Sequence, residues 1–71
     1  MRKVIIVTDE RELNDSIKVY SNRKKVFEKY KNHLTSYRVF CTSLEGGHAL
    51  TFKVPYTFMM CEVKIKSYYI N

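Results

Sequence analysis

One segment of the sequence, residues 21–34, has the spacing of an amphipathic helix, and it constrains the fold more than any other feature of the chain. Its apolar side chains recur at the interval of one helical face, which carries Val26, Phe27, Tyr30 and Leu34. Just before this run stands a residue that can cap a helix N-terminus, Ser21 or Asn22. The segment therefore predicts one helix that packs this face against the rest of the protein.

The outer face of this predicted helix is basic. Three cations, Arg23 to Lys25, fall in the first turn beside the positive end of the helix dipole, where each exposed cation is disfavoured by roughly 0.3–1 kcal/mol. A feature that costs stability points to a use, and an anionic partner would supply one. The basic residues predicted to bind a partner are Arg23, Lys24, Lys25, Lys29 and Lys31. The alternative is that this face only keeps the protein soluble, and both interpretations stay open here.

Two strands are predicted before the helix. Lys3–Thr8 is a continuous, β-branched apolar run, typical of a strand that is buried on both faces and central in its sheet. Ile17–Tyr20 alternates in polarity, which is typical of a strand covered on one face. The two would pair as a hairpin across a polar loop that ends at Asn14–Asp15. A single long helix over Asp9–Leu34 is the competing interpretation.

The segments after the helix read as sheet. Alternation over Tyr37–Thr42 and again over Leu50–Val54 favours two strands. We expect a hairpin turn between them at Gly46–Gly47, because glycine readily adopts the positive φ of tight hairpin turns. Pro55 lacks an amide donor, so it ends the second of these strands or marks a sheet edge.

A last strand is predicted from Thr57 to Ser67. Its alternation changes phase at Met59–Met60, and one extra residue there would restore a single buried face, which predicts a β-bulge. The chain of 71 residues is long enough for one domain. The predicted fold is thus a single α+β domain over residues 1–71. It has a mostly antiparallel sheet of four to five strands, with one helix packed on one face, in the order ββαβββ.

Charge and hydropathy narrow the class of partner. The chain carries 13 Lys and Arg against 7 Asp and Glu, a net charge of +6, which favours acidic protein surfaces or nucleic acid. Its apolar runs are shorter than the ~20 residues of a membrane helix, so we expect no membrane and a cytoplasmic location, that of the host if the protein is phage-encoded. Cys41 and Cys61 are expected to be reduced and buried.

Catalytic and metal-binding patterns are weak. Cys41 and Cys61 could in principle pair with His33 or His48 as a nucleophile and base, but nothing in their spacing favours it. The cysteines also lack the close pairing typical of structural zinc sites. The acidic residues of segment 9–12 are expected to form a solvated loop. We therefore expect a protein that is not an enzyme and holds no metal and no cofactor.

The run Tyr56–Met60 is unusually apolar and adaptable. Part of it must face the core, and any surplus would form an interface, because methionine repacks easily around a partner and tyrosine is frequent in interfaces. The partner-binding residues predicted in this run are Tyr56, Met59 and Met60.

The first half of the chain resembles a pattern in small uncharacterised phage and mobile-element proteins. In those, a "K-V-x-x-V-T" strand precedes a short strand that runs through "YS-N/S-x-x-K/E-A" into a helix. Here Lys3–Thr8 and Val19–Asn22 stand in those places, while Val26 and the basic first turn depart from the pattern. The resemblance implies a compact accessory protein that binds and blocks a host component, and it carries over no site residues.

Three functions follow as hypotheses. The first is a small non-enzymatic binding protein, a phage-type accessory protein or inhibitor that docks on a host protein. The second is a nucleic-acid-binding protein that sets its helix lysines on phosphates. The third is a structural protein that forms a homodimer or larger homo-oligomer through its C-terminal strand.

Overall fold

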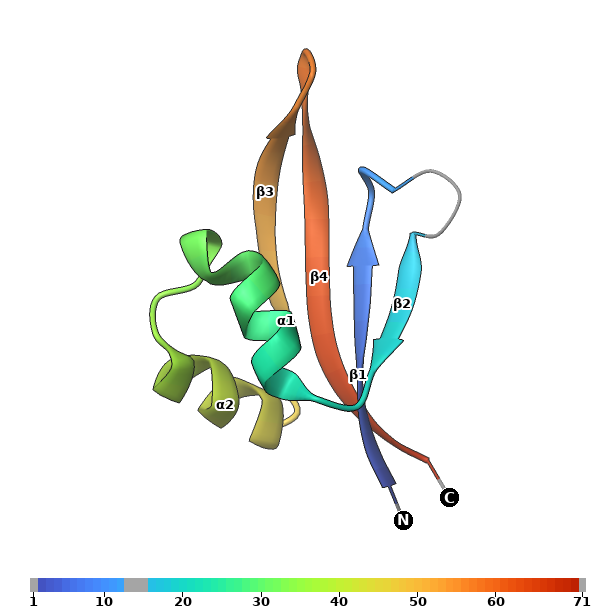
Figure 1. The fold of residues 1–71 in the computed structure, drawn as a ribbon, viewed down its shortest axis with the longest axis vertical. Coiled ribbons are helices and arrows are strands. Elements are labelled where there is room, and N and C mark those ends of the chain that lie inside the picture. Colours follow the sequence, from blue (N-terminus) through green and yellow to red (C-terminus); the bar gives the residue numbers. More distant parts are fainter. Residues whose placement is uncertain (1, 13–15, 71) are drawn as a thin grey trace.

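The computed structural model describes residues 2–12 and 16–70, which form a sheet layer and a helix layer (Figure 1). The elements in chain order are β1 (Arg2–Asp9), β2 (Ile17–Tyr20), α1 (Arg23–Tyr30), a 3₁₀ turn (Lys31–His33), α2 (Tyr37–Glu45), β3 (Leu50–Tyr56) and β4 (Met59–Ile70). The described strands form one antiparallel sheet in the order β2-β1-β4-β3. An α+β fold with an antiparallel sheet is therefore confirmed. The predicted order ββαβββ is wrong in detail, because a second helix replaces the third strand.

Strand β1 is an inner strand, as its apolar run predicted. It lies between β2 and β4, and Val4, Ile5 and Val7 are all buried. It pairs with β2 as an antiparallel hairpin in which Ile5 faces Tyr20. The hairpin is thus confirmed and the long-helix alternative is wrong. The predicted end of its loop, at positions 14–15, lies outside the described residues.

Helix α1 forms where the apolar face predicted it. The Asn22 side chain caps the helix by accepting a hydrogen bond of 2.9 Å from the Lys24 amide. Val26 and Tyr30 are fully buried against the sheet, and the partly buried Phe27 packs beside them. Capping and amphipathic spacing therefore agree with the tertiary structure here.

The segment Tyr37–Thr42 belongs to helix α2, so the strand predicted there is wrong. Ser36 caps this helix by accepting a hydrogen bond of 3.2 Å from the Val39 amide. The helix buries Phe40 and Leu44, four positions apart, and leaves Val39 exposed. Because the same residues fit a spacing of two or of four, alternation alone did not decide between strand and helix.

The Gly46–Gly47 pair ends α2 instead of turning a hairpin. The His48 amide donates to the Ser43 carbonyl at 3.0 Å, and the Gly47 amide donates to the Leu44 carbonyl at 3.1 Å. This pair of bonds is the Schellman motif, which needs a left-handed residue after the last turn. Gly47 supplies it with a φ of 76°.

Strands β3 and β4 form a regular hairpin, so the predicted β-bulge is also wrong. The pairing runs without interruption from Leu50 opposite Ile65 to Tyr56 opposite Met59. The change of phase in the sequence arises because the chain reverses at residues 57–58, inside the segment that was read as one strand. Pro55 lies on β3, which is an edge strand, as its missing amide donor predicted.

The core lies between the helices and one face of the sheet. It is built from residues of both helices and of three strands: Ile5, Val7, Val26, Tyr30, Phe40, Leu44, Val54, Cys61, Val63 and Ile65. Cys61 is buried there on β4, while Cys41 is only partly buried and lies on α2, and both are free thiols. Among the described residues, no helix has the length and apolar character needed to cross a membrane.

Candidate binding surfaces

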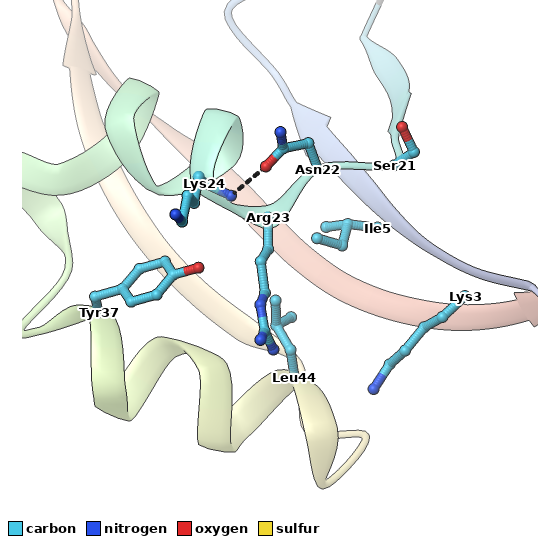
Figure 2. A pocket seen from close by; sticks show the side chains of 8 residues that line it. All are labelled: Lys3, Ile5, Ser21, Asn22, Arg23, Lys24, Tyr37 and Leu44. Atoms are coloured by element: carbon cyan, nitrogen blue, oxygen red, sulfur yellow. Dashed lines mark hydrogen bonds between the residues drawn. The ribbon is translucent and has the colours of Figure 1, made fainter.

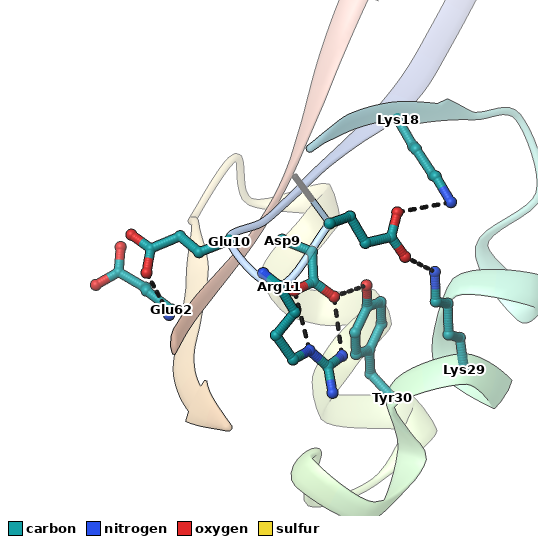
Figure 3. Close-up of polar contacts among 8 residues, drawn as sticks. Asp9, Glu10, Arg11, Lys18, Lys29, Tyr30 and Glu62 are labelled. Atoms are coloured by element: carbon teal, nitrogen blue, oxygen red, sulfur yellow. Dashed lines mark hydrogen bonds and ion pairs between the residues drawn. The ribbon is translucent and has the colours of Figure 1, made fainter. Parts of the chain in front are cut away.

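The acidic segment 9–12 has a structural role that its composition did not reveal (Figure 3). Asp9 ends β1 and is buried, and its carboxylate accepts hydrogen bonds from the Arg11 side chain at 2.8 and 3.0 Å. The buried Tyr30 hydroxyl donates a further bond of 2.9 Å to the same carboxylate. The bonds from Arg11 lower the pKa of Asp9 to about 2, although burial opposes the shift. The expected solvated loop is thus wrong at Asp9, which joins β1 to α1.

The other two acids of this segment also hold elements together. Glu10 accepts a hydrogen bond of 2.8 Å from the Glu62 amide on β4. Glu12 lies between two lysines, at 2.7 Å from Lys18 on β2 and 3.2 Å from Lys29 on α1. The acids therefore connect the end of β1 to three neighbouring elements.

Acidic side chains neutralise more than half of the predicted basic face. Arg23 lies 3.0 Å from Glu45, Lys29 lies 3.2 Å from Glu12, and Lys31 lies 3.6 Å from Glu28. Lys24 and Lys25 are exposed, and neither has a carboxylate partner among the described residues. The cations that remain available for an anion on α1 are thus concentrated in its first turn.

The partner-binding residues predicted on the C-terminal hairpin lie together at its end. We call this group the hairpin tip, and its members are Tyr56, Phe58, Met59 and Met60. All four side chains are exposed, Phe58 fully. The tip extends beyond the rest of the sheet (Figure 1), because β1 pairs with β4 only as far as Val63. Met59 to Glu62 therefore pair in the sheet with β3 alone.

Phe58 is the residue of the tip that the sequence reading did not select. The strand predicted from Thr57 onward placed Phe58 inside a strand, so its position in a turn was not foreseen. Only the structure places positions 57 and 58 in the turn, because the pairing of β3 with β4 ends at Tyr56 opposite Met59.

The turn of the hairpin is strained. Thr57 has a φ of 54°, in the left-handed region that β-branched residues rarely adopt. Two-residue hairpin turns favour Gly, Asn or Asp at such positions, and the pair Thr57–Phe58 supplies none of them. Strain and exposed apolar area thus coincide at the tip, a combination that is typical of functional sites.

Charges close to the tip are balanced. Lys53 on β3 lies 3.6 Å from Glu62 on β4, directly across the hairpin. The Glu10 side chain also accepts a hydrogen bond from the backbone amide of Glu62. The tip is therefore an apolar surface whose immediate charged neighbours include both signs.

In the described part of the chain the two histidines take part in structural contacts. The His33 ring stacks on Phe52 with 5.4 Å between ring centroids, and the His48 amide belongs to the C-terminal cap of α2. Residues 2–12 and 16–70 contain no group of three or more potential metal ligands.

A pocket of about 690 Å³ opens between β1, the start of α1 and α2 (Figure 2). It brings two of the predicted basic residues, Arg23 and Lys24, together with Lys3 of β1 and Tyr37 of α2. The basic field of the helix was expected to extend to Lys3 on the neighbouring hairpin, whereas Tyr37 was predicted in a strand, so its place beside the start of α1 was not foreseen.

Comparison of the chain with protein-family models, with curated proteins and with solved structures found no match. The resemblance to small phage and mobile-element proteins therefore stays a prediction, and the functional argument depends on the surfaces described above.

Proposed function

We propose that this protein is a small non-enzymatic binding protein that docks on a partner protein through its hairpin tip. The observation that carries the proposal is the position of Phe58, which is fully exposed at the end of a hairpin that extends past the rest of the sheet (Figure 1). A side chain of this size contributes about 1.5–3 kcal/mol when it is buried. Folding leaves the Phe58 side chain in water, so a partner that buries it would gain this free energy.

The shape and composition of the tip favour an apolar pocket on the partner. A single aromatic side chain on a narrow hairpin can enter a concave site, and buried aromatic anchors dominate the affinity of many interfaces. Met59 and Met60 flank this anchor and adapt to irregular surfaces because their side chains are unbranched and polarizable. Tyr56 adds an aromatic ring with a hydroxyl group that can reach the polar rim.

The charges support a protein partner more than a membrane or nucleic acid. An anionic membrane attracts clusters of cations, whereas Lys53 beside the tip already has Glu62 as its partner. Nucleic acid needs free cations along a surface, whereas three of the five basic residues predicted on α1 lie beside carboxylates. The resemblance to accessory proteins supports a partner from a host cell.

The test is an affinity capture from lysate of the host cell, with the wild-type protein and two variants. Phe58→Ser/Met59→Ser removes the apolar tip, and Val39→Ser removes another exposed apolar side chain, from α2, as a control. Both variants should unfold at the wild-type temperature. We expect one protein to be captured by the wild type and by the control, and to be lost with the tip variant.

The captured protein is then purified and titrated by calorimetry. Phe58→Ala should weaken its binding at least about 30-fold, the effect of removing a central aromatic anchor. Equal binding by the tip variant and the wild type would show that the tip is not the docking surface.

The two other hypotheses are tested in the same preparation. Light scattering with size exclusion measures the oligomeric state, with and without short DNA and RNA at low and high salt. Binding to nucleic acid that weakens steeply with salt, and that Lys24→Glu/Lys25→Glu/Lys31→Glu abolishes, would replace the proposal. A homodimer that Met60→Lys dissociates would show that a second copy occupies the tip.

A further inference from the structure

The pocket beside the start of α1 gathers groups from three elements (Figure 2). Its described lining consists of Lys3 and Ile5 from β1, residues 21–24 at the start of α1, and Tyr37 and Leu44 from α2. The volume of about 690 Å³ lies in the range of small-molecule sites. It is also larger than a single inorganic anion needs.

The polar part of this lining is cationic. Arg23 and Lys24 approach from the helix, and Lys3 approaches from the strand with its ammonium group over the Tyr69 ring. None of the described lining residues is a carboxylate. The Ser21 hydroxyl adds a hydrogen-bond donor. Ile5 and Leu44 also line the pocket, although both side chains are almost fully buried. The pocket thus combines three positive charges, one of them paired with Glu45, with the aromatic ring of Tyr37.

The geometry points to this pocket as a binding site for a small organic molecule that carries a phosphate monoester. A phosphate monoester has up to two negative charges and several acceptor oxygens, which guanidinium and ammonium groups bind with strong hydrogen bonds. The organic part would lie on the Tyr37 ring. Such a ligand would also offset the unfavourable position of the cations in the first turn of α1.

We expect the affinity of the pocket for an anion to depend on whether the Arg23 guanidinium is free to bind it. Its guanidinium now lies 3.0 Å from Glu45, but both side chains are about half exposed or more. Surface ion pairs of this kind contribute little to stability, so an anion in the pocket can compete for the guanidinium. Removal of the Glu45 charge should therefore strengthen binding of the anion.

The experiment is a calorimetric titration of the full chain with adenosine 5′-monophosphate, glucose 6-phosphate and adenosine. We expect both monoesters to bind saturably and adenosine to bind at least tenfold more weakly than its monophosphate. Nuclear magnetic resonance shifts should map to Lys3, to residues 21–24 and to Tyr37. Saturable binding of neither monoester, or equal binding of adenosine and its monophosphate, would overturn the proposal.

Three variants locate the site. Lys3→Gln should weaken binding roughly tenfold, the usual effect of losing one charge-assisted hydrogen bond. Lys64→Gln on the other face of the sheet is the matched control and should bind as the wild type does. Glu45→Gln should bind about threefold more tightly, and weaker or unchanged binding would contradict the role of Arg23. Unfolding temperatures show whether each variant is folded.

The comparison of the two monoesters also shows whether the pocket prefers a nucleotide or a sugar phosphate. Tighter binding of the nucleotide would indicate that Tyr37 stacks on a base, and Tyr37→Leu should then remove the difference. Equal binding of the two monoesters would indicate that the site recognises the phosphate group and accepts organic parts of different structure. Neither result depends on the hairpin tip, so Phe58→Ser/Met59→Ser should leave these titrations unchanged.

Discussion

At the scale of single residues, Asp9 connects the sheet to the helix layer. Its buried carboxylate joins Arg11 to the hydroxyl of Tyr30, which lies twenty-one positions away on α1. Burial and the hydrogen bond to Asp9 raise the pKa of Tyr30, so its hydroxyl keeps the donated proton across the physiological range. The pKa of Asp9 is about 2 in the folded protein, below the ordinary value of 3.8 that we expect in the unfolded chain.

Asp9→Asn should therefore lower the free energy of unfolding by about 2 kcal/mol at pH 7. Because the folded pKa is the lower one, the contribution is fully present above pH 4 and is lost as the pH falls through about 2. Urea unfolding at pH 7 and at pH 2 should thus show a large difference between variant and wild type only at pH 7. Glu28→Gln, on the exposed face of α1, is the control. An equal difference at both pH values would show that the charge of Asp9 is not what stabilises the fold.

At the scale of elements, the end of α2 decides how the chain returns to the sheet. Two amide-to-carbonyl bonds close the Schellman motif, and the left-handed Gly47 makes that geometry accessible. A hydrogen bond of 2.7 Å from the Ser67 hydroxyl to the Leu44 carbonyl then ties the last turn of α2 to β4. The position of β3 therefore depends on how this helix ends.

Gly47→Ala should lower the free energy of unfolding by about 1 kcal/mol, because a side chain is disfavoured in the left-handed region. The cause is conformational, since a Cβ built at Gly47 meets no atom within 4 Å. Gly47→Asn should cost less, because asparagine tolerates this conformation. Urea unfolding measures both. Equal losses for alanine and asparagine would indicate that the left-handed conformation is not the cause.

At the scale of the whole molecule, the hairpin tip is separate from the core. The last core residues of the hairpin, Val54 and Cys61, face each other directly. The six residues between them are all exposed, whereas the core on the other side of this pair joins both helices to the sheet. One part of this hairpin thus belongs to the core, and its other part, the hairpin tip, forms the proposed docking surface.

Replacing residues 55–60 with Asn-Gly should leave a folded protein. Asn-Gly favours the two-residue turn that directly paired strand residues need. We expect the unfolding temperature to stay within about 4 °C of the wild-type value, because the removed residues are exposed. Calorimetry measures that temperature, and the same variant should fail to capture the partner protein. A shortened chain that does not fold would show that the tip is needed for the fold.

The candidate surfaces were only partly accessible to sequence reasoning. The first-turn cations and the run Tyr56–Met60 were visible as patterns, because composition and spacing are local properties. The neutralisation of Arg23 was not visible, since Glu45 lies twenty-two positions away and reaches it only through the packing of α2 beside α1. The pocket was hidden for the same reason, because Lys3 and Tyr37 line it only once α1 and α2 have packed on the sheet.

By itself, the sequence determined the central strand β1 and the capped helix α1, and it favoured the hairpin with β2 over a long helix. In each of them, apolar periodicity, capping and turn residues within about ten positions agree. Only the tertiary structure decided the state of Tyr37–Thr42, whose spacing suits both a strand and a helix. The segment is helical because Phe40 and Leu44 then complete the core over the sheet, and because the following glycines stabilise a helix end. The same long-range packing left Phe58 exposed and buried Asp9, since burial is a property of the assembled chain.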